Sequence, residues 1–227
     1  MDSAGQLRAD VYDVSISTDA RWAFVGCGNG FVVVELHGAN GDPSFDVVDT
    51  FYTVWTSQVP NPFGNGQFYG KVEGIAQTGN HLFVSVIGGP NDPSPGLLAW
   101  FEFDPATGEV GERLGTFEGG VGPLLDVPFW EGGPVRVFEV TGTIARIYAA
   151  SSSSGAVLEF ELDTSGTSPT CTLLSHVPGG THFSQVSDVR PYDVWHSSGL
   201  PAVLVSRYRQ PIAVLAADGM IDLPEEP

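Results

Sequence analysis

Three carboxylates occupy similar places in segments that repeat one apolar pattern: Asp13, Glu139 and Asp193, with Glu73 one position out of register. If the strands that carry them line a common axis, these side chains converge. Several carboxylate oxygens are the ligands that Ca²⁺ prefers. The pattern therefore predicts an axial cation site, with Ca²⁺ as the candidate ion. In the alternative, structural interpretation, each carboxylate caps its own turn or accepts a backbone N–H from a neighbouring repeat.

A second group of candidate residues lies in the segments that link one repeat to the next. The links at 57–71, 123–130 and 179–187 include aromatic and polar side chains. Connecting loops often carry binding residues, and amphipathic aromatic side chains suit contacts with a partner. We expect partner contacts from Phe63, Phe68, Tyr69, Lys71, Phe129, Trp130 and His182. Alternatively, the same loops fold down as a lid on a central tunnel.

Signatures of catalysis are weak in this sequence. The five histidines share no repeat position and show no HxH or HExxH spacing, which argues against a histidine-bound catalytic metal. His182 and His196, which flank one expected strand, are the only pair placed to act as acid or base. There is no GxSxG motif and no glycine loop that opens a helix. The five tryptophans fall at different repeat positions, so a repeated sugar-binding platform is not expected.

Four copies of one layout would position all of these residues. Each copy has three apolar runs separated by turns and followed by a more polar run. In the first copy the runs begin at Val11, Trp22, Phe31 and Phe45. With Asp13, Gly74, Glu139 and Asp193 taken as equivalent, the copies span 11–56, 72–118, 136–178 and 189–223.

Four expected strands per copy and no helical periodicity predict an all-β fold, a β-propeller of four blades with four antiparallel strands each. One such sheet cannot bury both of its faces, so neighbouring copies must stack around an axis. We expect a single domain over 1–227. The four blades either close into a ring or form an arc of a larger or oligomeric propeller. Tandem β-sandwiches are the structural alternative.

The first repeat, with Tyr12-Asp13-Val14, the polar turn 17–21 and the runs 22–26 and 30–34, resembles the YVTN and LVIVD classes of propeller repeat. The segment 190–194 resembles the start of such a repeat. Repeats of these classes occur in surface-layer and adhesion-type proteins, in partner-binding domains and in sugar-lactone hydrolases. The resemblance therefore implies a propeller fold and leaves several functions open.

Charge narrows the choice of partner. The net charge is −18, from 27 acidic residues against nine Lys and Arg, which disfavours nucleic acids and anionic membranes. The alternative explanation of this acidity is solubility or a saline habitat. The N-terminal residues have no signal-peptide pattern, and no run is long enough to span a membrane, so we expect a soluble chain. Cys27 and Cys171 are expected to be free thiols.

These observations favour a non-enzymatic propeller that binds a protein partner or acts as a scaffold in a larger assembly. The competing hypothesis is a metal-dependent hydrolase of the lactonase type, which would use the axial carboxylates around a cation.

Overall fold

The computed structural model describes residues 10–37, 40–52, 69–88, 96–127, 129, 131–151, 154–177, 186–192, 202–207, 210–216 and 219–222. They form sixteen strands and one 3-10 helix, η1 (Gly122–Leu124). The strands build four antiparallel sheets, each with four strands in chain order. The predicted all-β fold with four four-stranded blades is therefore confirmed. No helix in the described ranges has the length and apolar character of a membrane span.

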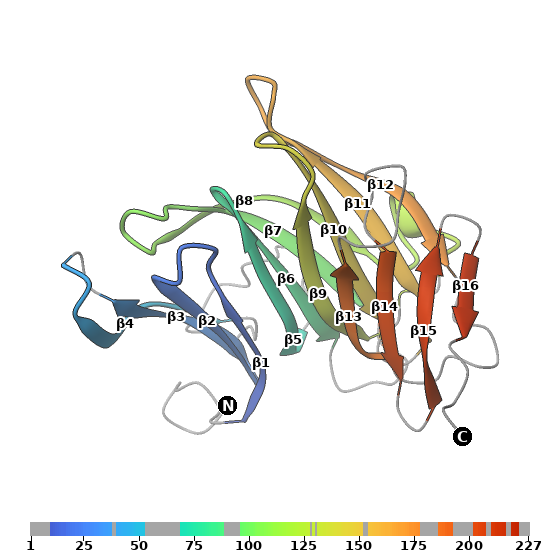
Figure 1. Ribbon diagram of the computed structural model, residues 1–227, viewed down its shortest axis with the longest axis horizontal. Helices are drawn as coiled ribbons and strands as arrows, with labels where there is room; N and C mark the ends of the chain where they lie inside the picture. The colour runs from blue at the N-terminus through green and yellow to red at the C-terminus, as the bar shows by residue number, and fades with distance from the viewer. Residues whose placement is uncertain are drawn as a thin grey trace.

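The strands of the first two sheets are β1 (Val11–Ile16), β2 (Trp22–Cys27), β3 (Gly30–His37), β4 (Pro43–Tyr52), β5 (Tyr69–Thr78), β6 (His81–Gly88), β7 (Leu97–Phe103) and β8 (Val110–Glu118). Those of the third and fourth sheets are β9 (Gly132–Glu139), β10 (Ile144–Ser151), β11 (Val157–Asp163), β12 (Thr170–Val177), β13 (Val186–Tyr192), β14 (Ala202–Arg207), β15 (Gln210–Ala216) and β16 (Gly219–Asp222). Figure 1 shows the inner strands β1, β5, β9 and β13 following one another from left to right.

Each strand sends alternate side chains to opposite faces of its sheet, and β3 is a clear example. Its run of β-branched and aromatic residues favours a strand, and successive residues point to opposite sides. Phe31 and Val33 are fully buried, whereas Val32 and Val34 are only partly buried. One face of the first sheet is therefore inside the molecule, and the other face is not covered to the same degree.

Three apolar cores lie between successive sheets. Trp22, Phe24 and Phe31 of the first sheet pack against the second, and Phe24 meets Phe103 edge-on with ring centroids 5.1 Å apart. A second core joins the second and third sheets, where Phe117 lies 4.6 Å from Phe160 between centroids. A smaller third core joins the third and fourth sheets. Because each sheet buries a face against the next, the four copies stack in sequence as expected for a propeller.

The pairing register corrects the expected equivalence of the copies. Each inner strand has an irregularity in its pairing with the next strand, and in the first and fourth sheets it falls immediately before Asp13 and Asp188. The second and third sheets have theirs before Gly74 and between Gly132 and Val135. The residue equivalent to Asp13 is therefore Asp188 in the fourth sheet, not Asp193. In the third sheet it is Pro134, not Glu139.

Close backbone approach explains the glycine in the second copy. A Cβ on Gly74 would collide with the carbonyl oxygen of Gly133 and the amide of Val135. The inner strands β5 and β9 are therefore packed at backbone distance, where only glycine fits. No equivalent close packing between β1 and β13 is seen in the described part of the chain.

Candidate functional site

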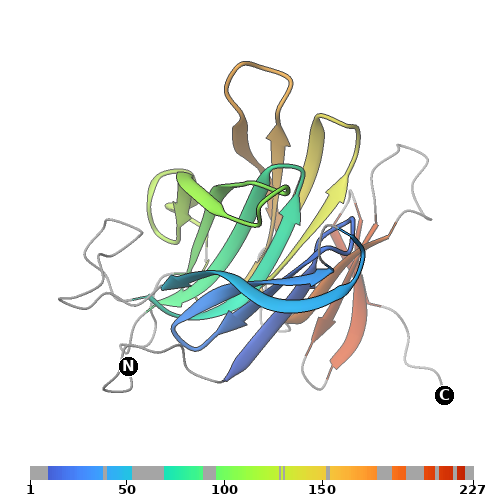
Figure 2. The same cartoon turned by 90° about the vertical axis from the view of Figure 1, so that its left-hand side faces the viewer.

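The short turns of the first three sheets gather at one end of the molecule. In Figure 2 the turquoise β5–β6 turn, the yellow β9–β10 turn and the orange β11–β12 turn all lie at the upper end. Three adjoining hollows of about 720, 340 and 220 Å³ open there, and Asn80 in the β5–β6 turn lines all three. We call this end the turn face. The last residue of β4, Tyr52, and the first residue of β5, Tyr69, lie at the other end of their sheets.

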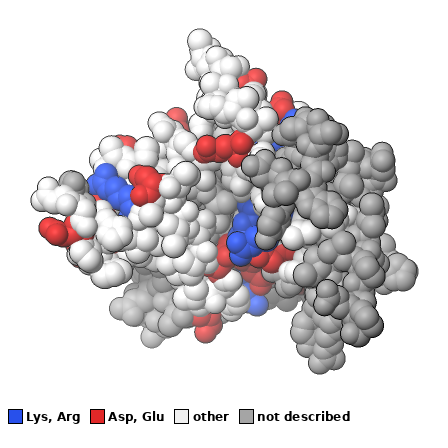
Figure 3. All heavy atoms as spheres, viewed as in Figure 1, with Lys and Arg blue, Asp and Glu red and all other residues white. Residues whose placement is uncertain are grey.

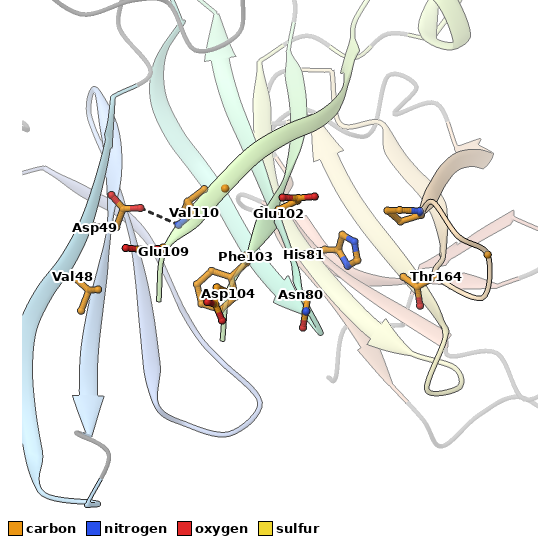
Figure 4. Close-up of a pocket in the computed structure, with 13 residues that line it drawn as sticks. Val48, Asp49, Asn80, His81, Glu102, Phe103, Asp104, Glu109, Val110 and Thr164 are labelled. Atoms are coloured by element: carbon orange, nitrogen blue, oxygen red, sulfur yellow. Dashed lines mark hydrogen bonds between the residues drawn. The ribbon is translucent and has the colours of Figure 1, made fainter. Parts of the chain in front are cut away.

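The largest hollow lies between the first, second and third sheets (Figure 4). Its lining includes four carboxylates and one histidine, and none of its thirteen lining residues is Lys or Arg. The lining residues are Val48, Asp49, Asn80, His81, Glu102, Phe103, Asp104, Glu109, Val110, Gly111, Thr164, Gly166 and Pro169. Because positive charge is missing from this wall, the hollow has the electrostatic character of a site for cationic groups.

Two of the four carboxylates accept hydrogen bonds that stabilise the fold. Asp49 accepts a hydrogen bond from the backbone N–H of Val110 at 3.0 Å, which ties β4 to β8 of the next sheet. Asp104 holds the β7–β8 turn by accepting from Ala106 N–H at 2.8 Å and from the Thr107 hydroxyl at 3.0 Å. The Ala106 N–H, followed by the Thr107 hydroxyl, lowers the pKa of Asp104 below its ordinary value.

Glu102 and His81 form a directly opposed pair on β7 and β6. His81 is 9% exposed, and its ring centroid is 5.8 Å from that of Trp100. Burial lowers the His81 pKa, although the charge of Glu102 acts in the opposite direction. The imidazole is therefore neutral at pH 7, and the net charge on this wall is carried by the carboxylates. Glu102 and Glu109 are both solvent-exposed at the hollow, where they can meet a ligand.

Glu139 extends the acidic lining into the two smaller hollows. Its Oε1 accepts from the Thr78 hydroxyl at 3.1 Å, which joins the end of β9 to the end of β5. Asp13 is also bound to β5, where its Oδ2 accepts from Ile75 N–H at 3.0 Å. Ile75 and Thr78 are three residues apart on one strand, roughly 10 Å. Glu139 therefore belongs to the turn face and not to a common site with Asp13.

A guanidinium lies beside the predicted axial carboxylate. Arg136 on β9 contacts Asp13 Oδ2 through Nη1 at 3.1 Å and Asp188 Oδ1 through Nη2 at 3.0 Å. The side chains are 19%, 11% and 24% exposed for Arg136, Asp13 and Asp188. Asp13 thus does what the structural interpretation proposed, because it accepts an N–H from the neighbouring sheet. Asp193 is outside the described residues, and within them no group of three or more His, Cys, Asp or Glu has the arrangement of a metal site.

The predicted partner contacts fall largely outside the described residues. Those outside the described residues are Phe63, Phe68, Trp130 and His182. The side chain of Tyr69, the first residue of β5, is also outside the described part of the structure. Lys71 is exposed, and its Nζ lies 4.9 Å from the centroid of the Tyr12 ring. Phe129 is fully buried in the core between the second and third sheets, so its side chain packs inside the molecule.

Comparisons with known proteins give no family assignment. No family model matches the chain, so the resemblance to the YVTN and LVIVD repeat classes has no further support, and no curated protein matches it. Among solved structures, Hsv2p of Kluyveromyces lactis is 14% identical, with a TM-score of 0.45 over 92% of this chain and 50% of that one. Hsv2 of Kluyveromyces marxianus is 9% identical, with a TM-score of 0.30 over 96% of this chain and 82% of that one.

This chain therefore spans about half the length of the first of these structures. Both identities and both TM-scores are low, so the propeller assignment rests on the four sheets and their stacking described above.

The acidic hollow was missed because its residues are far apart in the sequence. Asp49, His81, Glu109 and Thr164 come from three different sheets and carry no motif. The one available signal was the acidic ends of β7 and of the turn after it, Glu102, Asp104 and Glu109, within eight residues.

Proposed function

We propose that this chain is a non-enzymatic binding propeller whose turn face accepts a basic segment of a protein partner. The observation that carries this proposal is the hollow of about 720 Å³ with four carboxylates and no Lys or Arg in its wall. Arg and Lys side chains suit such a wall because each donates several charge-assisted hydrogen bonds to carboxylates. The net charge of −18 would also steer a basic partner toward the molecule.

The continuity of the hollows favours an extended ligand over a single small cation. All three adjoin at Asn80, and acidic side chains line each of them: Glu102 and Glu109 in the largest, Glu139 in the other two. A peptide with basic residues spaced along it could place one in each hollow. A compact ion would instead need several oxygens around one point.

The hydrolase alternative receives less support from the axial residues. A lactonase-type mechanism would need the inner-strand carboxylates to face a cation. Asp13 and Asp188 instead face the Arg136 guanidinium, whose positive charge would repel a cation placed beside them. We also propose the scaffold form of the function, in which the links between sheets contact a partner. Lys71 and the aromatic residues of the same link, Phe63, Phe68 and Tyr69, would make these contacts.

The test is binding of a fluorescent arginine-rich peptide, measured by anisotropy at 50 mM and 300 mM salt. We expect Glu102→Gln with Glu109→Gln to weaken binding by about tenfold, since charge-assisted hydrogen bonds contribute about 1.5–3 kcal/mol each before solvent screening. The matched control is Asp10→Asn with Asp126→Asn, which removes two charges at exposed positions outside the three hollows. Equal loss in both double variants would mean that only net charge attracts the peptide, and the proposed site would be wrong.

A further inference from the structure

One apolar face of the first sheet is exposed, although the equivalent face of each of the other three sheets is buried. Ile75, Val135 and Val189 come directly after the residues equivalent to Asp13, and all three are 0% exposed because the preceding sheet covers them. The first-sheet counterpart, Val14, is 52% exposed. We call the face of a sheet toward the preceding sheet its leading face, and the opposite one its trailing face.

The same difference continues across the sheet. Val84, Ala149 and Val205 lie opposite Ile75, Val135 and Val189 and are again 0% exposed. Val25, which lies opposite Val14, is only partly buried. The leading face of the first sheet thus has the composition of an internal face but lacks a covering sheet among the described residues.

This uncovered face is extensive and carries no charge. By register and strand alternation its positions are Val11, Val14, Ile16, Ala23, Val25, Cys27, Gly30, Val32, Val34, Leu36, Val47 and Thr50. Ala23, Cys27 and Gly30 are buried within this face, and its exposed members lie on β1 and β4. Val11, Ile16 and Val47 are 57%, 58% and 59% exposed. Most of the surface over β1 and β2 in Figure 3 is white. On a chain of net charge −18, an exposed apolar sheet face of this kind marks an interaction surface.

The chain itself shows what kind of surface fits a leading face. Phe24, Phe83 and Tyr148 stand at equivalent positions of the trailing faces and are at most 2% exposed, because each packs into the core against the leading face of the next sheet, as Phe24 does on Phe103. Leu204 occupies this position in the fourth sheet, with Val214 opposite it, and both are only partly buried. The fourth sheet therefore has a trailing face that is also incompletely covered.

Within the described part of one chain, these two faces are not packed on each other. Arg136 lies between β1 and β13, bound to Asp13 through Nη1 and to Asp188 through Nη2. Among the described residues, the strands of the first sheet do not pack on those of the fourth in the way that successive sheets do. Within the described residues, one chain thus presents an incompletely covered trailing face at one end of its stack and an incompletely covered leading face at the other.

We propose that a second copy of this chain covers the leading face of the first sheet with the trailing face of its own fourth sheet. The contact continues the sheet-on-sheet packing that occurs three times within the chain. Because the two surfaces differ, the association is heterologous, and two such contacts close a pair into a ring of eight sheets. Repulsion between two chains of −18 opposes the pairing at low salt, so it strengthens as salt screens the charges.

The test is the mass in solution by light scattering at 0.1 M and 1 M KCl. We expect the wild-type chain to reach twice its 24.0 kDa mass at high salt. Val14→Asp and Leu204→Asp should each weaken self-association at least tenfold. The control Val121→Asp, at a 55% exposed position just before η1, should leave it unchanged. Ile16→Asp, at a still more exposed site of the leading face, serves if Val14→Asp does not fold.

Mixing the variants separates this arrangement from its rivals. Val14→Asp keeps an intact trailing face and Leu204→Asp an intact leading face, so an equimolar mixture should regain a dimer that neither forms alone. If Leu204→Asp alone still dimerises, two leading faces pair with each other and the head-to-tail arrangement is wrong. A wild-type chain that stays monomeric at both salt concentrations also overturns the proposal.

Discussion

Replacing Arg136 with methionine should destabilise the fold strongly, because this one guanidinium neutralises carboxylates from two other sheets. Arg136 lies 3.1 Å from Asp13 and 3.0 Å from Asp188, and its side chain is only 19% exposed. Removing one partner of a buried ion pair costs about 3–5 kcal/mol, whereas an exposed pair contributes about 0–1 kcal/mol. For this partly buried site we expect a loss of about 2–3 kcal/mol in the free energy of unfolding.

The assay is urea unfolding followed by tryptophan fluorescence. With an m value of about 2–3 kcal/mol per molar urea, the expected loss lowers the midpoint by about 1 M. Arg190→Met is the matched control, because Arg190 contacts the same Asp188 at 2.6 Å but is 62% exposed. Its loss should stay below about 1 kcal/mol. If Arg136→Met costs no more than Arg190→Met, the Arg136 bridge does not hold the inner strands together and the reasoning fails.

Three further predictions concern packing and titration. Gly74→Ala should cost about 2–4 kcal/mol through overpacking and lower the melting temperature, while Gly142→Ala, whose Cβ would meet nothing within 4 Å, should be nearly neutral. Burial lowers the His81 pKa below its ordinary 6.5, so between pH 7 and 5 the unfolded chain binds more protons than the folded chain does. The free energy of unfolding should therefore fall as the pH drops from 7 to 5, and the fall should be smaller in His81→Asn. Burial raises the pKa of Cys171 to about 12 and also raises that of Cys27, so iodoacetamide at pH 8 should alkylate the native thiols far more slowly than those of the urea-unfolded chain.

The sequence was sufficient to predict the sheets but not their exact alignment. Apolar runs such as 31–34 and 97–101, separated by glycine-rich or polar turns, specify strands through local preference and alternation. The phase of the inner strands is set instead by a one-residue irregularity, before Asp13 in the first copy and before Asp188 in the fourth. Such an irregularity shifts the alternation of side chains by one residue, but no residue type of its own marks it in the sequence. Asp193, five residues after Asp188, therefore looked equivalent to Asp13 although it is not.

The role of Asp13 illustrates a second limit. A lone carboxylate at a repeated position fits a metal ligand and a backbone acceptor equally well. What decides between them is Arg136, which is 123 residues away in sequence and lies at 3.1 Å only because β9 stacks beside β5. Pairing between distant charges is set by the stacking of sheets, and no local pattern reports it.

The acidic residues of the turn face have two roles, because some stabilise the turns and others are placed to bind a partner. Asp19, Asp104 and Asp163 each accept a backbone N–H two residues onward, at 3.1, 2.8 and 2.8 Å. Hydrogen bonds lower the pKa of all three, chiefly those from the side chains of Ser17 to Asp19 and of Ser165 to Asp163 and from the backbone N–H of Ala106 to Asp104. These carboxylates fix the turns that shape the hollows. The carboxylates that remain to meet a partner at the hollows are those with longer side chains, Glu102, Glu109 and Glu139.

Because the turns are held by their own hydrogen bonds, the hollows are formed before a ligand binds. Little conformational entropy is therefore lost on binding. This division makes the proposed function more specific. Replacing Asp104 should damage peptide binding only by loosening the β7–β8 turn, which would appear as lower stability, whereas replacing Glu109 should weaken binding with stability unchanged. A loss of stability in both variants would mean that no carboxylate on this face is kept for a partner.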